Sequence, residues 1–251
     1  MLVFVADIGK NNEYMSEKLR KRCLELVNCK RREKVGRIRN QGDKDRSLAA
    51  GILLNVATGM YEEHMTNASL GTNLIRNPID YFVDRYDSTY DYEIVSGTNG
   101  KPEYKKGKDI PEIYFNLSHS GEFVVCAVSH KPIGVDIEGN RKVSLKTAKR
   151  FFTAAECKWV CGNENSNEDE QLEATLSQQK RFFRIWTMKE AYSKFTGIGI
   201  ANGISQAEFI PDEEGKLKPR SIHNEQNFSE INTWEYECDG YHIAVIGSES
   251  N

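Results

Sequence analysis

Hydrophobic positions recur along the first half of the chain with two spacings, one typical of strands and one of helices. Residues 1–8 form a continuous apolar run, which predicts a buried strand. Apolar residues then recur every three or four positions over 12–28 and again over 45–65, which predicts two amphipathic helices. The apolar stripes consist of Met15, Leu19, Cys23 and Leu26 in the first helix and of Leu48, Ile52, Leu53 and Val56 in the second.

The second half repeats this alternation of strand and helix patterns. A hairpin is predicted at 113–129, strands at 133–140, 206–210, 233–238 and 241–247, and helices at 144–160 and 184–197. Thr153 and Glu156 have the spacing of a capping box, and Gly197 is a typical helix end. Asp239-Gly240 predicts a tight turn between the last two strands.

Two polar stretches interrupt these patterns, and both are interpreted mainly as loops. They are 67–100, with one strand expected at 92–95, and the acidic segment 162–178. Each half of the chain, 1–131 and 132–251, therefore combines strands with helices, and the predicted fold class is α+β. Because no sequence repeat relates the halves, any duplication would be visible only in the structure.

Composition narrows the class of protein. The 251 residues carry a net charge of −3 and are 39% hydrophobic, which disfavours a uniformly basic nucleic-acid binder or a membrane-surface protein. No apolar run approaches the roughly 20 residues of a membrane span, and the N-terminus lacks the features of a signal peptide. The six cysteines form no CxxC pair or zinc pattern. We expect a cytoplasmic protein with free thiols.

Positive charge is nevertheless concentrated near the N-terminus. Eight basic residues lie within 30–46: Lys30, Arg31, Arg32, Lys34, Arg37, Arg39, Lys44 and Arg46. Such a run is usually a solvated face, but here it could bind the phosphates of a small ligand or RNA. No aromatic residues are interleaved with it, which disfavours binding of single-stranded nucleic acid.

The strand GVDIE, residues 134–138, carries two carboxylates on one face. Asp136 and Glu138 lie roughly 7 Å apart by strand geometry, and they repel each other unless positive charge lies between them. A solvated edge strand is one interpretation. A hard cation such as Mg²⁺, which prefers oxygen ligands, is the other. Glu190 is a candidate third carboxylate.

The helix RIWTMKEAYSKFTG, residues 184–197, places Lys189, Glu190 and Lys194 close together. A solvated face with a Glu190–Lys194 pair would be worth only roughly 0.2–0.5 kcal/mol and needs no function. The strand NLSHS offers Ser118, His119 and Ser120 as donors to phosphate oxygens. The chain lacks a GxSxG motif, which disfavours a Ser–His–Asp nucleophile.

In this order, the segments resemble the 4′-phosphopantetheinyl transferases, specifically the larger Sfp-like (surfactin-type) group. GVDIE is similar to the metal-binding strand of that family, and WTMKEAYSK fits its W-[STC]-x-K-E-[AS]-x-x-K helix at every fixed position. FNLSHSG, GKP, SLKTAKRFF and RREKVGR…DRSL also match. The resemblance covers most of the chain.

This resemblance implies transfer of the phosphopantetheine arm from coenzyme A to a serine of an apo carrier protein, leaving 3′,5′-ADP. It implies two similar α+β halves with the active site between them, in a monomer. It also implies dependence on Mg²⁺, with Mn²⁺ as an alternative. The carrier, whether of fatty-acid, polyketide or nonribosomal-peptide synthesis, is left open.

The resemblance also assigns roles to individual residues. Asp136, Glu138 and Glu190 would hold the metal. Glu190, Lys194 and His119 are the catalytic candidates, with Glu190 the general base, directly or through a water, and Lys194 beside the leaving phosphate. The expected coenzyme A contacts are Arg31, Lys34, Arg46, Ser47, Lys101, Pro102, Ser118, His119, Asp136 and Lys194.

The chain departs from the family pattern in several places. Arg31 stands where Lys is familiar, Asn99 precedes GKP where an aromatic residue is expected, and the connection 67–98 is longer than usual. Lys180, Phe182 and Phe183 are the expected carrier contacts. Two other hypotheses compete: an RNA- or nucleotide-binding protein using 30–46, and another Mg²⁺-dependent phosphoryl-transfer enzyme such as a nuclease.

Overall fold

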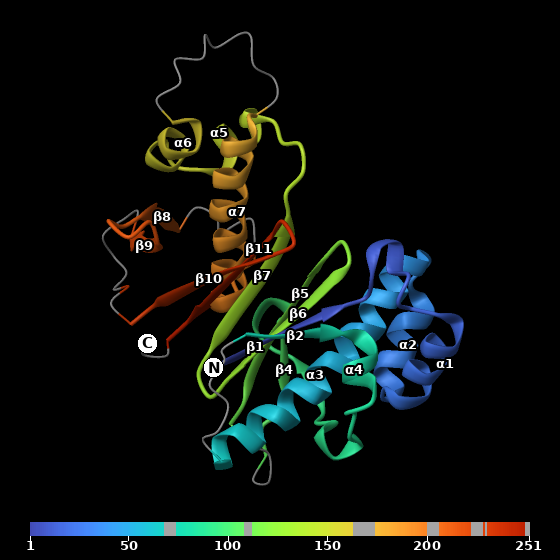
Figure 1. Cartoon of the computed structure of the whole chain (residues 1–251). Coiled ribbons are helices and arrows are strands. Elements are labelled where there is room, and N and C mark those ends of the chain that lie inside the picture. Colours follow the sequence, from blue (N-terminus) through green and yellow to red (C-terminus); the bar gives the residue numbers. More distant parts are fainter. Residues whose placement is uncertain are drawn as a thin grey trace. The chain divides into compact units, whose positions relative to one another are not determined.

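The computed structural model describes residues 1–67, 74–107, 112–162, 174–199, 206–221, 228 and 230–248. It confirms the predicted α+β class (Figure 1). The chain divides into two compact units, unit 1 (Met1–Ile133) and unit 2 (Gly134–Asn251). That 1–131 and 132–251 are domains related by duplication stays a prediction.

Unit 1 is built on a four-stranded sheet of order β2-β1-β6-β5. Its strands are β1 (Leu2–Asp7), β2 (Leu74–Pro78), β3 (Ile94–Ser96), β4 (Pro102–Tyr104), β5 (Tyr114–Ser120) and β6 (Phe123–Ser129). Its helices are α1 (Glu17–Leu26), α2 (Cys29–Arg37), α3 (Gln41–Asn67) and α4 (Ile79–Val83), with 3₁₀ turns at Lys10–Asn12, Ser88–Tyr90 and Thr98–Gly100. β1 is parallel to β2 and antiparallel to β6, and β3 and β4 form a separate two-stranded ribbon.

The core of unit 1 lies between α3 and the central strands β1 and β6. Alternate strand residues point to one face, so the apolar run of β1 supplies Leu2, Phe4 and Ala6 to this core. The stripe predicted for 45–65 packs against them through Leu48, Ile52, Leu53 and Val56. The longest helix of unit 1 is therefore held by an apolar face.

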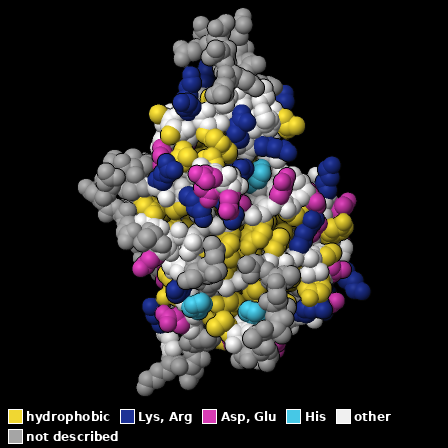
Figure 2. All heavy atoms as spheres, turned by 60° about the vertical axis from the view of Figure 1, so that its left-hand side comes forward, with side chains coloured by type: hydrophobic (Ala, Val, Ile, Leu, Met, Phe, Trp, Pro, Cys, Tyr) yellow, Lys and Arg dark blue, Asp and Glu magenta, His cyan; other side chains and the backbone are white. Residues whose placement is uncertain are grey.

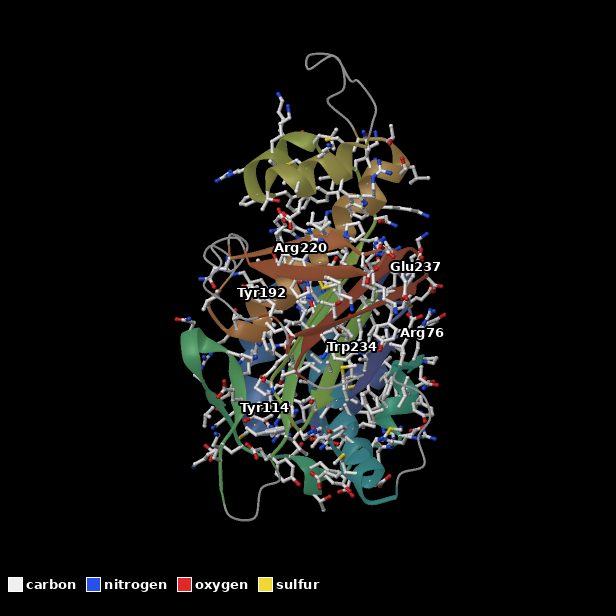
Figure 3. The ribbon with its side chains drawn as sticks, turned by 90° about the vertical axis from the view of Figure 1, so that its left-hand side faces the viewer. Arg76, Tyr114, Tyr192, Arg220, Trp234 and Glu237 are labelled. Atoms are coloured by element: carbon white, nitrogen blue, oxygen red, sulfur yellow. The ribbon has the colours of Figure 1, made fainter. Side chains whose placement is uncertain are left out.

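Unit 2 has a three-stranded sheet of order β10-β11-β7 and a separate hairpin of β8 and β9. Its strands are β7 (Ile133–Gly139), β8 (Ala207–Pro211), β9 (Leu217–Ser221), β10 (Asn232–Cys238) and β11 (Tyr241–Gly247), and its helices are α5 (Leu145–Phe151), α6 (Ala154–Cys161) and α7 (Leu176–Thr196). α7 packs on β11. Trp234 and Glu237, three residues apart on β10, project from opposite faces of the strand (Figure 3).

Several local predictions are confirmed. Thr153 and Glu156 form the capping box of α6, with both reciprocal hydrogen bonds present. Gly197 ends α7 in the left-handed conformation. The β10–β11 turn has positive φ at both Asp239 (45°) and Gly240 (79°), as a type I′ hairpin requires.

The structure contains regular elements in segments for which the sequence analysis predicted a loop or predicted no structure. The basic segment contains a regular helix, α2, capped by the Asn28 side chain. Within 67–100, the interpretation as a loop was wrong for β2 and α4, because the short LIRNP strand pairs with β1 and lacks the alternation that reveals longer strands. Residues 163–173 of the acidic segment lie outside the described residues.

The two units share one order of elements. In unit 1 a first strand, β1, is followed by helices ending in a long one, α3, and by the β5–β6 hairpin, whose second strand pairs with β1. In unit 2 the same order runs from β7 through α7 to the β10–β11 hairpin, whose second strand neighbours β7. This correspondence is what a structural duplication predicts.

The surface agrees with the small net charge. On the face shown in Figure 2, Lys and Arg side chains are interspersed with Asp and Glu side chains. Among the helices that the structure describes, none is long and apolar enough to cross a membrane.

Candidate active site

The helix α7 carries two of the candidate catalytic residues, Glu190 and Lys194, and has a defined cap at each end. Thr175 and Gln178 form a capping box at its start, and Gly197 ends it. Over its last three turns the side chains of Met188, Lys189, Glu190 and Tyr192 are all buried. A solvated-face interpretation of this helix is therefore wrong.

Lys189 and Glu190 are adjacent in sequence but have different surroundings. Lys189 is 1% exposed, and its Nζ lies 3.0 Å from Glu156 Oε2 and donates to the Ala207 carbonyl at 2.9 Å. Glu156 also accepts hydrogen bonds from the backbone amides of Thr153 and Phe209. Lys189 is therefore a structural residue that ties α7 to α6 and β8.

A glycine allows β7 to approach α7 closely. A Cβ atom at Gly134 would overlap the Ala191 carbonyl oxygen and the backbone of Phe195. The strand that carries Asp136 can therefore lie directly against the helix that carries Glu190 and Lys194.

Asp136 and Lys194 form an ion pair across this contact. Lys194 Nζ lies 2.7 Å from Asp136 Oδ1 and also donates to the Val135 carbonyl at 3.2 Å. The whole Asp136 residue is 5% exposed, whereas the Lys194 side chain retains 28% exposure. The pair thus joins a buried carboxylate to a cation that solvent can reach.

Glu190 is the third member of this group. It is 7% exposed, and burial raises its pKa to about 7, with further upward contributions from Asp136 and Glu138 and an opposing one from Lys194. The three carboxylates therefore interact electrostatically, although Glu138 is held separately by Arg141 at 2.7 Å. Arg141 is a neighbour that sequence reasoning missed.

The oxygen atoms of Asp136, Glu138 and Glu190 are of the kind that a divalent cation binds. Carboxylate oxygens are suitable ligands for Mg²⁺ or Mn²⁺, and three of them with one raised pKa form a site that gains from added positive charge. Among the described residues, no three side chains are already arranged as a metal-binding cluster. Lys194 and Arg141 instead hold Asp136 and Glu138, and these ion pairs would have to open for a metal to bind.

Unit 1 holds the residues expected to contact coenzyme A. Arg31 on α2 reaches α3, where its Nη1 donates to the Ser47 carbonyl at a long 3.5 Å. Partial desolvation and the nearby Arg31 charge lower the pKa of Lys34, and Ser47 Oγ is buried with no hydrogen-bond partner among the described atoms. Ser118 is buried on β5, and the next residue, His119, is exposed.

Two further cations contact backbone carbonyls of unit 1. Arg46 donates to Gly121 O at 3.3 Å, in the β5–β6 turn. Lys101 donates to Ile133 O at 3.2 Å, and desolvation lowers its pKa. Pro102, the first residue of β4, is exposed. Arg46 therefore lies beside the hairpin that carries His119.

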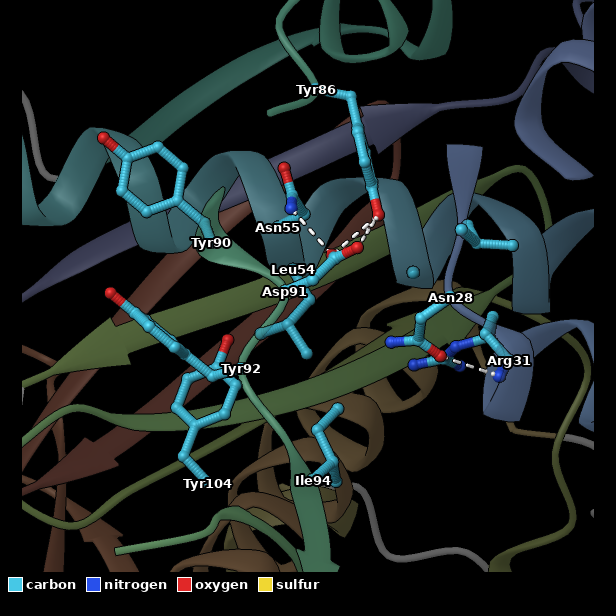
Figure 4. A pocket seen from close by; sticks show the side chains of 12 residues that line it. Asn28, Arg31, Leu54, Asn55, Tyr86, Tyr90, Asp91, Tyr92, Ile94 and Tyr104 are labelled. Atoms are coloured by element: carbon cyan, nitrogen blue, oxygen red, sulfur yellow. Dashed lines mark hydrogen bonds between the residues drawn. The ribbon is translucent and has the colours of Figure 1, made fainter. Parts of the chain in front are cut away.

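Two features of the structure differ from sequence expectations. Phe182 and Phe183 are 2% and 1% exposed in the core of unit 2, so they are not available as carrier contacts, whereas Lys180 is exposed. Sequence reasoning also missed a pocket in unit 1 that is lined by Arg31 and four tyrosines (Figure 4). The run of tyrosines in 81–92 was the available signal.

Comparison with known proteins identifies the family. Residues 132–246 match the family model of the 4′-phosphopantetheinyl transferase superfamily. The 4′-phosphopantetheinyl transferase Sfp of Bacillus subtilis (strain 168) is 30% identical over 240 residues, covering 93% of this chain and 88% of that protein. The 4′-phosphopantetheinyl transferase psf-1 of Bacillus pumilus is 40% identical over 122 residues, covering 49% and 47%, and HetI of Nostoc sp. is 35% identical over 165 residues, covering 63% of each.

The chain thus belongs to the 4′-phosphopantetheinyl transferase superfamily. Within that superfamily it is an enzyme of the Sfp-like type, as the sequence motifs predicted. The matched region, 132–246, includes the ion pair, Glu190 and Glu138. The roles of the individual residues remain predictions.

Proposed function

We propose that the protein transfers the 4′-phosphopantetheine arm of coenzyme A to a serine hydroxyl of an apo carrier protein in a Mg²⁺-dependent reaction. The serine oxygen forms a bond to the phosphorus that carries phosphopantetheine, and the bond from this phosphorus to 3′,5′-ADP breaks. The observation that carries the proposal is the buried Asp136–Lys194 ion pair beside Glu190, in the region that matches the family.

Asp136, Glu138 and Glu190 would hold the divalent ion. When bound, the ion supplies positive charge that neutralises phosphate oxygens, which is the main requirement of phosphoryl transfer. Mn²⁺ satisfies the same oxygen ligands. Support comes from the chemistry of the three carboxylates and from the raised pKa of Glu190, which added positive charge would lower.

Glu190 and Lys194 would move protons at the two ends of the reaction. An ionised carboxylate can accept the proton of the serine hydroxyl, so Glu190 would act as the general base, directly or through a water. The Lys194 side chain pairs with Asp136 but is partly exposed. Because solvent can reach its ammonium group, that group would also be able to neutralise or protonate the phosphate of the leaving 3′,5′-ADP. His119, exposed at the end of β5, is a further candidate for contact with the phosphates.

Coenzyme A would be bound largely by the cations of unit 1. Desolvation lowers the pKa values of Arg31 and Lys101, which are partly buried, and of Lys34, which is exposed, and all three cations are suited to bind an anionic ligand. Arg46, Ser47, Pro102 and Ser118 complete the proposed contacts. The carrier protein is the second partner, and we expect the enzyme to act as a monomer.

The test is the intact mass of an apo carrier protein after incubation with this protein, coenzyme A and Mg²⁺. We expect a gain of one phosphopantetheine, no gain with EDTA, and a rate at least about 100-fold lower in Asp136→Ala. Glu237→Gln, which alters an exposed carboxylate on β10, is the matched control and should react like the unaltered protein (Figure 3). No gain with fatty-acid, polyketide and peptide carriers, or full activity in Asp136→Ala, would contradict the proposal.

A further inference from the structure

The pocket of unit 1 is formed partly by the long connection before the GKP turn, which supplies five of its twelve lining residues. It lies between α2, α3 and this connection (Figure 4). Its lining consists of Val27, Asn28, Arg31, Gly51, Leu54, Asn55, Tyr86, Tyr90, Asp91, Tyr92, Ile94 and Tyr104. Because Arg31 is also a proposed coenzyme A contact, the connection brings new side chains next to the donor site.

Asp91 is the only carboxylate in this lining, and its hydrogen bonds are all made within the unit. The Tyr86 hydroxyl lies 2.6 Å from each of its carboxylate oxygens, and the Asn55 amide donates to Oδ1 at 2.9 Å. The same amide also donates to the Asp87 carbonyl at 2.7 Å, and Asn55 Oδ1 accepts from the Asp87 amide. Asn55 therefore anchors both residues of the connection to α3.

The Arg31 guanidinium in the same pocket makes fewer hydrogen bonds than the Asp91 carboxylate. The guanidinium has five N–H donors, yet among the described residues it makes a single hydrogen bond, the 3.5 Å contact to the Ser47 carbonyl. No described carboxylate lies within ion-pair distance of it, although Asp91 lines the same pocket. A guanidinium and a carboxylate that line one pocket can pair only if the carboxylate is free to turn toward the guanidinium, and hydrogen bonds to Tyr86 and Asn55 hold the Asp91 carboxylate.

Tyr86 lies within electrostatic range of both charges. Burial raises the pKa of the Tyr86 hydroxyl, the hydrogen bond to Asp91 and its charge raise it further, and the charges of Arg32 and Arg31 oppose that rise. The hydroxyl thus keeps its proton and remains a donor to Asp91. Figure 4 shows the Asp91 carboxylate directed toward Tyr86 and Asn55, with Arg31 beside Asn28.

We propose that Tyr86 and Asn55 occupy the Asp91 carboxylate and thereby keep the Arg31 guanidinium available to bind a phosphate group of coenzyme A. Tyr86 is then a positioning residue, which acts on the donor through Arg31. This inference rests on the proposed function, because it takes coenzyme A as the anion that Arg31 binds. It gives the long connection a role in donor affinity.

The test is calorimetric titration of the full-length protein with coenzyme A in the presence of Mg²⁺. Tyr86→Phe removes one donor to Asp91, so the carboxylate can pair with Arg31, and we expect the Kd for coenzyme A to rise about tenfold. Adding Asp91→Asn to this variant removes the competing charge and should restore the Kd to within about threefold of the unaltered protein. Tyr92→Phe is the matched control, because the Tyr92 hydroxyl donates to Glu62 rather than to Asp91.

The outcomes separate this inference from the proposed function. A Kd unchanged in Tyr86→Phe, or one that the second substitution fails to restore, would overturn the role of Tyr86 while wild-type carrier modification continues. A wild-type protein that neither binds coenzyme A nor modifies carriers would overturn both proposals. In steady state, Tyr86→Phe should raise KM for coenzyme A and leave kcat nearly unchanged, whereas misfolding would lower the thermal midpoint and kcat together.

Discussion

The long helices α3 and α7 have the same place in the order of elements of the two units, yet the polar side chains that they bury have different surroundings. In unit 1 two buried polar side chains of α3 are bound by neighbours of the same unit: Thr58 bonds to Leu54 and Tyr104, and the Asp45 carboxylate accepts four hydrogen bonds. In unit 2, α7 buries Glu190 close to the charges of Asp136 and Glu138.

This difference distinguishes a structural group of buried residues in unit 1 from the candidate active site in unit 2. Arg20, Asn12 and Gln41 satisfy Asp45, and a carboxylate with that many donors is stable and has no further chemistry to perform. Three carboxylates that share two cations retain excess negative charge, which a ligand can neutralise. The same order of strand, helix and hairpin thus surrounds a fully hydrogen-bonded carboxylate, Asp45, in unit 1. In unit 2 it surrounds three carboxylates that repel one another.

The largest change in stability is expected where unit 2 does satisfy a buried charge. Glu156→Gln leaves Lys189 buried beside a neutral partner, and we expect the free energy of unfolding to fall by about 3–5 kcal/mol. Denaturant unfolding measures this loss. Glu214→Gln, which breaks the exposed Glu214–Lys216 pair, should change stability by less than about 1 kcal/mol. Equal losses in the two variants would mean that the buried pair has no special role.

The buried Glu190 of the candidate active site should make stability depend on pH. The folded pKa of Glu190 is about 7, above its ordinary 4.5, so between these values the folded state binds a proton that the unfolded state does not. This contribution therefore destabilises the metal-free protein as pH rises through the window, by about 2–3 kcal/mol in total. The measurement is denaturant unfolding in EDTA from pH 5 to 8. Glu190→Gln should flatten the profile, and an unaltered profile in that variant would assign the dependence to other groups.

A smaller effect tests the contact between β7 and α7. Gly134→Ala inserts a Cβ against the Ala191 carbonyl, and we expect a loss of about 1–3 kcal/mol together with reduced turnover, because Asp136 moves away from Lys194. Gly36→Ala is the matched control, since nothing lies within 4 Å of the added atom in α2. That change should be neutral or stabilise by about 0.5–1 kcal/mol. Thermal unfolding and the carrier mass assay measure both variants, and equal behaviour would argue against close packing at Gly134.

Much of the fold could be predicted from the sequence because the patterns that indicate it are local. The stripe of α3, the capping box at Thr153 and the turn at Asp239 depend on neighbours within a few residues, and all were predicted correctly. The strand β2 was missed, because its pairing with β1 joins residues about 70 positions apart. A strand of only five residues is too short to show a clear alternation of apolar and polar positions.

The candidate site was predicted through its motifs rather than through its contacts. Motif spacing indicated Asp136, Glu190 and Lys194, and the structure brings these three together. Spacing could not show that Lys189 pairs with Glu156, that Arg141 holds Glu138, or that Asp91 lines the same pocket as Arg31. Each of these depends on which way a helix or loop is turned, which tertiary packing decides.

The adjacency of Lys189 and Glu190 has a consequence for how variants of this enzyme would be interpreted. A random-mutagenesis screen for lost activity would mark both positions as intolerant, and a ranking by position alone would merge them into one hotspot. Abundance measured alongside activity would separate them, because changes at Lys189 should deplete the folded protein, whereas changes at Glu190 should leave inactive protein in the cell. The Lys-Glu dipeptide would therefore combine two different requirements, one of folding at Lys189 and one of the proposed turnover at Glu190.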